Sequence, residues 1–331
     1  MSAQENKYRI RLGLCCLNTV LREQKPPIFM SRGCIQSTFE SKGLAYVREL
    51  ARQNLLDMIK MIQWNYENGI EVFRLSSDIF PHITNQRLDL TDYRLEHFDH
   101  LFKRLGNFAR QRNQRLTFHP GQFNVLGTPN LDALKATFYE LYIHATILDK
   151  MGCDQDSVMV IHGGGVYGNK KATMDRWCKN YMKLPINVRN RLVLENCEKN
   201  FSIEDCLEIS EKVGVPVVLD NHHFFCYNIL HKEHPLAHPI DYYIPAVLET
   251  WHRKGIRPKF HLSEQGSGKT GHHSDFISAI PDYYLEIPGK YNTNIDIMIE
   301  AKMKEQAIFQ LYGLHTEHFN SPKKMETAIV P

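Results

Sequence analysis

The segment Val158-Met159-Val160-Ile161-His162-Gly163-Gly164-Gly165 decides how this sequence is expected to fold. A short apolar run that is bounded by turn residues predicts a fully buried strand. Here the run ends on a histidine, and three glycines follow it. The next run of this kind, Leu192-Val193-Leu194-Glu195, ends on a glutamate. The repeating unit is therefore a buried strand that delivers one potential metal ligand at its end.

The same unit recurs along the chain, at 116–119, 217–220, 259–261 and 297–300, and two further strands are expected at 9–14 and 70–75. Helical periodicity fills the intervals, at 43–67, 92–112, 132–150, 172–183, 203–213, 242–254, 274–280 and 302–312. Strands that alternate with helices predict a parallel sheet with crossover helices. Ligand-type residues end nearly every strand instead of gathering at one switch point, which favours a closed barrel over an open sheet. We expect a single α/β domain over 1–331, a (β/α)₈ TIM barrel.

Composition excludes several classes of protein. The sequence has 331 residues, 43% of them hydrophobic, but it contains no apolar stretch of eighteen residues, so we expect no membrane span. The first eleven residues lack the apolar centre of a signal peptide, and the eight cysteines form no Cys-x-x-Cys pair. We therefore expect reduced thiols and a monomeric intracellular protein, in the cytoplasm or nucleoid, or in the nucleus of a eukaryote. A net charge of +3 does not by itself indicate nucleic-acid binding.

The strand ends predict a polynuclear metal site, because the carboxyl ends of barrel strands converge on one face. The expected ligands at strand ends are His119, His162, Glu195, Asp220, His261 and Glu300, and His223 follows Asp220 by three residues. A buried acid such as Glu195 is costly without a cation beside it, and it could bridge two of them. Nitrogen and oxygen donors without cysteine suit Zn²⁺ or Mn²⁺ and leave the choice between them open.

Three residues near these ligands needed separate interpretation. His82 and His273 stand in loops after strands, where spacing alone allows either a ligand or a solvated surface residue. Lys259 points to the same side of its strand as His261, because side chains alternate with a period of two. A lysine cation that points into a metal site is unexpected.

The sequence resembles the UV damage endonuclease (UvdE-type) family, and the resemblance spans nearly the whole chain in one order. The matching segments are Arg11-Leu12-Gly13 with Asn18, Phe73-Arg74-Leu75-Ser76-Ser77-Asp78, His119-Pro120-Gly121-Gln122-Phe123, Ile161-His162-Gly163-Gly164, Leu194-Glu195-Asn196, Leu219-Asp220-Asn221-His222-His223, Lys259-Phe260-His261-Leu262-Ser263 and His273-Ser274-Asp275-Phe276. That family is similar in fold to endonuclease IV, in the xylose-isomerase-like group of TIM barrels. It carries a trinuclear metal cluster, typically of Mn²⁺, although Zn²⁺, Mg²⁺ or Co²⁺ can substitute.

The resemblance also implies roles for the ligands. Glu195 would bridge two cations, the first also held by His119 and His162 and the second by Asp220, His261 and Glu300. His223 and His273 would hold a third, with His82 nearby, although His272 is an alternative to His273. Lys259 would be carboxylated, which turns the cation into an anionic oxygen donor, and Glu195 and Lys259 would then be the catalytic residues.

Residues for the DNA follow from the same resemblance. Gln122 and Phe123 match a Gln-Tyr pair that probes the duplex at the lesion, and here the aromatic face remains but the hydroxyl is lost. Leu14 stands where some members carry a tyrosine. We expect Arg9, Asn18, Lys170, Lys171 and Lys269 to contact the DNA backbone, which positions the duplex without reading its sequence.

The expected reaction is metal-dependent incision of damaged double-stranded DNA immediately 5′ of a UV lesion, which starts an alternative excision repair. The lesions would be cyclobutane pyrimidine dimers, 6-4 photoproducts and abasic sites. Two alternatives remain at this stage. A sugar isomerase or epimerase can use the same barrel, and so can a non-catalytic protein that only binds damaged DNA.

Overall fold

The computed structural model describes residues 8–85, 87–88 and 90–319 of the chain. Eight strands occur in the described residues: β1 (Ile10–Cys15), β2 (Val72–Arg74), β3 (Arg115–Thr117), β4 (Met159–His162), β5 (Leu192–Glu195), β6 (Val217–Val218), β7 (Lys259–Leu262) and β8 (Ile295–Ile299). All the pairings between these strands are parallel. They follow the expected positions to within a few residues.

The strands form two sheets that meet at two junctions. One sheet has the order β3-β2-β1-β8-β7, and the other has the order β4-β5-β6. The first junction is a bridge in which the Phe118 amide donates to the Val158 carbonyl over 2.9 Å. At the second, Asp220 faces His261, and the His261 amide donates to the Leu219 carbonyl over 3.1 Å. With both junctions closed, the eight strands form the expected (β/α)₈ barrel.

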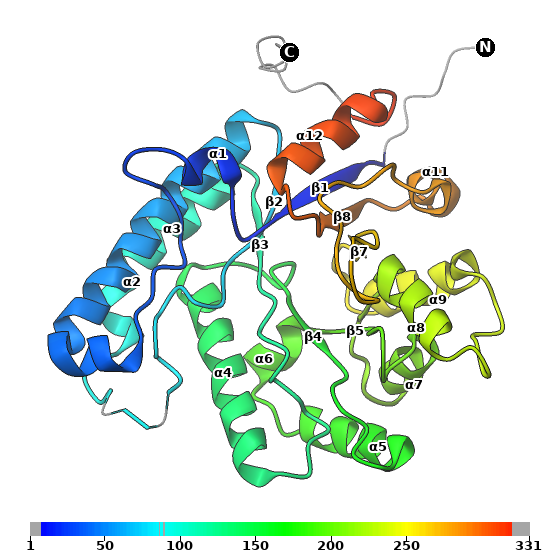
Figure 1. Ribbon diagram of the computed structural model, residues 1–331, viewed down its shortest axis with the longest axis horizontal. Coiled ribbons are helices and arrows are strands. Elements are labelled where there is room, and N and C mark those ends of the chain that lie inside the picture. The colour runs from blue at the N-terminus through cyan, green and yellow to red at the C-terminus, as the bar shows by residue number, and fades with distance from the viewer. Residues whose placement is uncertain (1–7, 86, 89, 320–331) are drawn as a thin grey trace.

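Helices lie around the outside of the strands (Figure 1). They are α1 (Thr19–Arg22), α2 (Gln36–Glu67), η1 (Leu95–Phe98), α3 (Asp99–Gln111), α4 (Leu131–Lys150), α5 (Lys170–Tyr181), α6 (Ile186–Arg191), α7 (Ile203–Val213), α8 (Asn221–Leu230), α9 (Ile240–His252), α10 (Asp282–Leu285), α11 (Ile287–Tyr291) and α12 (Glu305–Leu314). Within the described chain, no helix is long and apolar enough to cross a bilayer.

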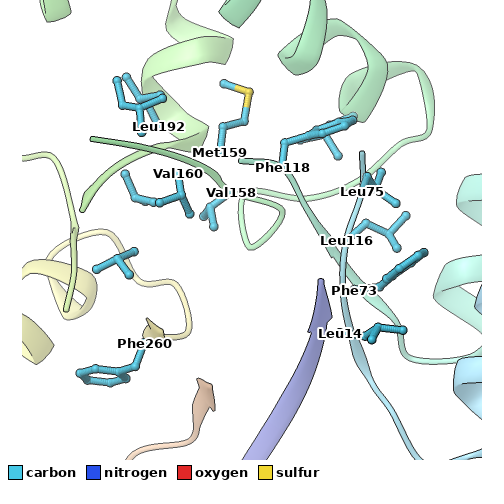
Figure 2. Packing of buried hydrophobic residues seen from close by; sticks show 14 of the residues in the cluster. Leu14, Phe73, Leu75, Leu116, Phe118, Val158, Met159, Val160, Leu192 and Phe260 are labelled. Carbon is cyan, nitrogen blue, oxygen red and sulfur yellow. The ribbon is translucent and has the colours of Figure 1, made fainter. Parts of the chain in front are cut away.

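The main core lies between the strands and this layer of helices. Figure 2 shows buried apolar side chains from several strands; Phe73 and Leu116, on the neighbouring strands β2 and β3, lie close together, and Phe260 of β7 lies further away. Burying such side chains stabilises the fold by about 1.5 to 3 kcal/mol each. Gly106 allows α3 to pack closely against the end of α4, because a Cβ at this position would lie 1.6 Å from the carbonyl oxygen of Met151.

One predicted helix is absent, and one helix near the ligands was not predicted. The helix expected at 274–280 is absent, because this segment bonds elsewhere: the Ser278 amide donates to Glu264, and Ser274 and Asp275 accept from the segment after β8. Conversely, α8 begins directly after Asp220, in a segment for which we predicted no helix. The Asp220 side chain caps this helix by accepting from the His223 amide over 2.8 Å, an arrangement typical of helix N-termini.

Candidate metal centre

Seven of the nine expected ligands gather at the carboxyl end of the barrel. Three groups of them have ligand atoms within 4.8 Å of one another: His119, His162 and Glu195; His119, His261 and Glu300; and Glu195, Asp220 and His223. Each residue stands at the end of a different strand, except His223, which lies in the first turn of α8. The parallel topology therefore places the strand-end residues on one face, as the sequence pattern predicted. It brings together residues up to 181 positions apart in the chain.

Glu195 lies at the centre and is 1% exposed. Its Oε2 atom lies 2.9 Å from Nε2 of His119 and 3.7 Å from Nε2 of His162. Its Oε1 atom lies 2.8 Å from Nδ1 of His261 and 3.5 Å from Nδ1 of His223. The two oxygens thus face different pairs of imidazoles, which is the arrangement that a carboxylate bridging two cations requires.

The backbone around these ligands is fixed by short-range interactions. Asn196, next to Glu195, donates to the Asp220 carbonyl over 3.1 Å and accepts from the Asp220 amide over 2.8 Å, so it connects the ends of β5 and β6. After His162 the chain passes so near Phe201 that a Cβ on Gly163 would lie 2.3 Å from its ring. Only glycine can occupy that position, which explains the first glycine after the histidine.

Glu300 follows β8 and receives a partner that sequence reasoning missed. Its carboxylate forms an ion pair with the Arg74 guanidinium at the end of β2, and it lies 3.3 Å from Nδ1 of His261. Nε of Arg74 also donates to the Cys16 sulfur over 3.4 Å. An arginine that ends a buried strand on the ligand-bearing face was the available signal. His273 approaches the same carboxylate at 3.9 Å, outside the three groups.

Electrostatics hold the central acids ionised. Burial raises the pKa of Glu195, but electrostatic interactions with His261 and His162 and hydrogen bonds from His119 and His223 outweigh it and leave the pKa well below its usual range. Burial likewise opposes ionisation of Glu300, and Arg74 and His261 bring its pKa down. Burial also lowers the pKa of His162 to about 4, so this imidazole is neutral near pH 7. Ionised carboxylates and neutral imidazoles are the forms that bind metal ions.

Three buried ligand atoms in the described residues have no hydrogen-bond partner: Nδ1 of His162, Oδ2 of Asp220 and Nε2 of His261. Buried polar atoms are nearly always hydrogen-bonded, so each exception needs an explanation. A cation would explain the exception at Asp220, whose Oδ1 accepts from the His223 amide while Oδ2 is left unpaired. In His162 and His261 the other ring nitrogen is the one that approaches Glu195. The cluster could therefore hold metal ions.

Lys259 lies in β7, two residues before His261, and it is fully buried. Its hydrogen-bond partner is the Thr117 hydroxyl at 3.4 Å. Burial, together with the positive charges of Arg74 and Arg115, lowers the pKa of the Lys259 ammonium to about 8. A substantial fraction of this amine is therefore neutral at mildly alkaline pH, and only a neutral amine can react with CO₂.

The remaining expected site residues are placed less uniformly. His82 lies beside Cys34, with 3.6 Å between Nε2 and Sγ, and belongs to none of the three groups. Gln122 and Phe123 are exposed in the loop after β3, Phe123 by 83%. His119, Gly121 and Phe123 line one shared cavity, so the aromatic ring stands near the ligand cluster.

The basic residues that we expected to contact DNA lie in different parts of the barrel. Arg9 precedes β1, at the opposite end of the barrel from the ligands, and pairs there with Glu71 at 2.9 Å; this position argues against contact with a substrate at the cluster. Lys269 is exposed in the loop after β7. Lys170 and Lys171 begin α5 and pair with Asp205 and Glu208.

Two uncharged positions are buried. Asn18 is 1% exposed, and its side chain caps α1 by accepting from the Leu21 amide over 2.7 Å. This cap occupies the side-chain oxygen, whereas the side-chain nitrogen is buried without a hydrogen-bond partner among the described residues. Leu14 is fully buried within the core.

Comparison with known proteins gives one consistent result. The family described as UV-endonuclease UvdE matches residues 10–330. A putative UV-damage endonuclease of Acanthamoeba polyphaga mimivirus is 40% identical over 311 residues, which cover 93% of this chain and 92% of that protein. The UV-damage endonuclease of Schizosaccharomyces pombe is 38% identical over 92% of this chain, and the match spans 50% of its own length. The UV DNA damage endonuclease of Bacillus cereus strain B4264 is 34% identical, covering 78% of this chain and 80% of its own.

Solved structures agree with the sequence matches. The crystal structure titled SacUVDE matches with a TM-score of 0.77 at 28% identity, covering 93% of this chain and 99% of that one. Endonuclease IV from Thermus thermophilus matches with a TM-score of 0.54 at 13% identity, over 93% of this chain and 98% of its own. At that identity the second likeness shows a shared fold alone, and it confirms the expected endonuclease IV-like barrel.

Proposed function

Since this chain belongs to the UV-endonuclease UvdE family and is by that membership a nuclease that hydrolyses DNA phosphodiester bonds, we propose that it incises damaged double-stranded DNA immediately 5′ of UV lesions in a metal-dependent reaction. The substrates are cyclobutane pyrimidine dimers, 6-4 photoproducts and abasic sites, and the nick starts excision repair. The observation that carries the metal dependence is the placement of four imidazoles around both oxygens of the buried Glu195.

The ligands divide among three divalent cations, with Mn²⁺ as the proposed metal. Glu195 bridges two of them. His119 and His162 complete the first, and Asp220, His261 and Glu300 complete the second. His223 and His273 hold the third, with His82 as a further candidate. When bound, such cations lower the pKa of a water toward neutrality and offset charge on the phosphate oxygens.

The protein side chains contribute orientation. Arg74 holds Glu300 in place through their ion pair, and Asn196 fixes the Asp220 backbone. Lys259, as a carbamate, would supply an anionic oxygen from the same strand as His261, and its lowered ammonium pKa of about 8 favours the neutral amine that this modification requires. Glu195 and Lys259 are therefore the proposed catalytic residues.

Lesion recognition falls to the loop after β3. Gln122 and Phe123 are exposed beside the cluster and occupy the space that the flipped nucleotides leave, where the Phe123 ring stacks on a neighbouring base. Lys269 is free to contact phosphates from its exposed loop. Lys170 and Lys171 can do so only by leaving their acidic partners.

The test is a nicking assay on supercoiled plasmid with Mn²⁺, which compares irradiated with unirradiated DNA. The expected result is conversion of irradiated plasmid to the relaxed form, with the cut mapped 5′ of the lesion on a labelled duplex. Glu195→Gln should abolish nicking, whereas Glu211→Gln, which removes an exposed carboxylate paired with Arg253, should not. Cutting that persists in chelator would contradict the metal dependence. Binding without cutting would contradict the reaction.

A further inference from the structure

Lys304 has an unusual backbone conformation close to the expected metal ligands. It follows Glu300 in the segment after β8 and directly precedes α12. Its φ is 50° and its ψ is −118°, a conformation that is strained for a residue with a Cβ and readily available only to glycine. Residues with such strain persist where the surrounding structure fixes them, and they are common at functional sites. The side chain of Lys304 is therefore kept at a position that glycine would occupy with less strain.

One neighbour of this position is the loop after β7. The Lys302 amide donates to the Ser274 carbonyl over 3.0 Å. The Met303 amide donates to the Asp275 carbonyl, also over 3.0 Å. These two bonds hold the residues before Lys304 at the carboxyl end of the barrel, where the metal ligands lie.

The other neighbour is the start of α1, which Glu305 contacts. Glu305 is fully buried, and both of its carboxylate oxygens accept from the Thr19 amide over 2.9 Å. Its Oε1 atom also accepts from the Val20 amide over 3.0 Å. The helices α1 and α12 therefore start close together at this end of the barrel (Figure 1). The backbone of Lys304 is thus fixed between α1 and the loop after β7.

The Lys304 ammonium has no ion pair and no hydrogen bond within the part of the chain that the structure describes, although the side chain is half-buried. The acids next to it in the chain are engaged elsewhere. Glu305 accepts from the α1 amides, and Glu300 pairs with Arg74. A cation that is partly withdrawn from water favours an anionic partner, so this ammonium is available to an anion from outside the protein.

The charge of Lys304 acts on the strand ends at the metal centre. Burial raises the pKa of the Cys15 thiol to about 12, and the charges of Arg74 and Lys304 oppose this shift. Cys15 ends β1, and Arg74 ends the neighbouring strand β2 and pairs with Glu300. The Lys304 ammonium is therefore close enough to this part of the barrel for its charge to be felt there.

On the basis of the incision activity proposed above, we propose that the Lys304 ammonium binds a non-bridging oxygen of the DNA phosphate that is cut. That phosphate must lie against the metal ligands, and Glu300 is an expected ligand from the same segment of chain. A hydrogen bond from an ammonium to a phosphate oxygen is charge-assisted, and it offsets the negative charge on the phosphate during hydrolysis. Lys304 is thus a further catalytic residue, and it acts on the substrate directly.

The test measures cutting of a labelled duplex that contains one pyrimidine dimer, with Mn²⁺ and a saturating excess of enzyme. Lys304→Gln should cut about 10- to 100-fold more slowly than wild type, the range expected for a hydrogen bond to a charged group. Lys304→Arg keeps the charge and should recover most of the rate. Lys302→Gln is the matched control, because Lys302 is exposed on the same segment and lies 3.6 Å from Asp275; it should cut at the wild-type rate. Metal content should be equal in all four proteins.

The salt dependence of DNA binding gives a readout that does not require cutting. Each phosphate contact contributes about 1 to the slope of the logarithm of affinity against the logarithm of salt concentration. The slope should fall by about 1 in Lys304→Gln and stay unchanged in Lys302→Gln. Equal slopes would overturn the proposal, and so would a lower slope with an unchanged saturated rate, which would place the contact on a flanking phosphate. A wild type that binds the duplex without cutting it would contradict the incision activity instead.

Lys304→Gly separates a role in catalysis from a role in folding. Glycine adopts a φ of 50° without steric conflict, so this variant should melt no lower than wild type, yet it should cut as slowly as Lys304→Gln. A melting temperature below that of wild type would show that the side chain is kept for folding, and the proposal would then be wrong.

Discussion

The Arg74 guanidinium at the end of β2 pairs with the Glu300 carboxylate, which follows β8 on the far side of β1. This ion pair spans the end of β1 and orients one oxygen of Glu300 toward Arg74 and His261. The other oxygen faces His273 at 3.9 Å. Arg74 is therefore a positioning residue for an expected metal ligand.

Arg74→Gln should reduce both metal content and nicking. Residues that orient metal ligands typically contribute about 10- to 100-fold to affinity or activity, and we expect a loss of that order in both. Metal content is measured by elemental analysis after dialysis, and nicking on irradiated plasmid. Arg253→Gln, which removes an exposed arginine paired with Glu211, is the control. Unchanged metal content with reduced cutting would instead place Arg74 in contact with the DNA.

Phe123→Ala should weaken the binding of damaged DNA without destabilising the fold. The ring is 83% exposed, so its removal costs little packing, while aromatic stacking on a base contributes about 1 to 3 kcal/mol. The measurement is the dissociation constant for a duplex with one pyrimidine dimer and for the undamaged duplex. Phe123→Tyr keeps the ring and should retain binding. Equal losses for both duplexes would refute a role in lesion recognition.

Carboxylation of Lys259 should depend on pH in a defined direction. Burial, with Arg74 and Arg115, sets the ammonium pKa near 8, so lowering the pH below that value protonates the amine and removes the form that reacts with CO₂. We expect the modified fraction and the nicking activity to fall together as the pH is lowered from 8.5 to 6, and bicarbonate to raise both at pH 7. Native mass spectrometry gives the fraction. Full activity with an unmodified lysine would rule out the carbamate.

Asp296→Asn should destabilise the protein by about 3 kcal/mol at pH 6, because it leaves three arginines without their buried carboxylate. Burial opposes ionisation of Asp296, but Arg115 and Arg11 lower its pKa from 3.8 to about 2. The ionised form is thus favoured in the folded state, and it contributes about 2 kcal/mol above pH 4 that is lost as the pH falls through 2. Urea unfolding of both proteins at pH 6 and pH 3 measures this, and the difference between them should shrink at low pH.

The sequence was sufficient to predict the barrel, because parallel strands that are buried on both faces require short runs of apolar residues, and such runs are easy to identify. It was also sufficient to predict which residues meet at the carboxyl end of the barrel, since strand ends such as His162 and Glu195 must meet on one face. Hydrogen bonds between separate loops were harder to predict. The segment at 274–280 has helical composition, yet Glu264 and the chain after β8 take its hydrogen bonds.

The roles of several single residues also escaped prediction. Asn18 looks like a loop amide in the sequence, but it caps α1 and is buried. Arg9 reads as one more basic residue near a strand, yet the strand direction places it at the wrong end of the barrel. The ion pairs of Asp296 with Arg11 and Arg115 could not be foreseen, because these residues are scattered through the chain.

The two sheets of the barrel are joined by isolated bridges, one at Phe118 and another at Asp220, and not by longer strand pairings. Candidate ligands flank both places: His119 and His162 at the first, Asp220 and His261 at the second. An ion shared across either pair would fasten one sheet to the other. Removal of the metal should therefore speed amide hydrogen exchange in β6 and β7 before it affects β1 and β8. The ions that take part in the reaction would then also stabilise the junction between the two sheets.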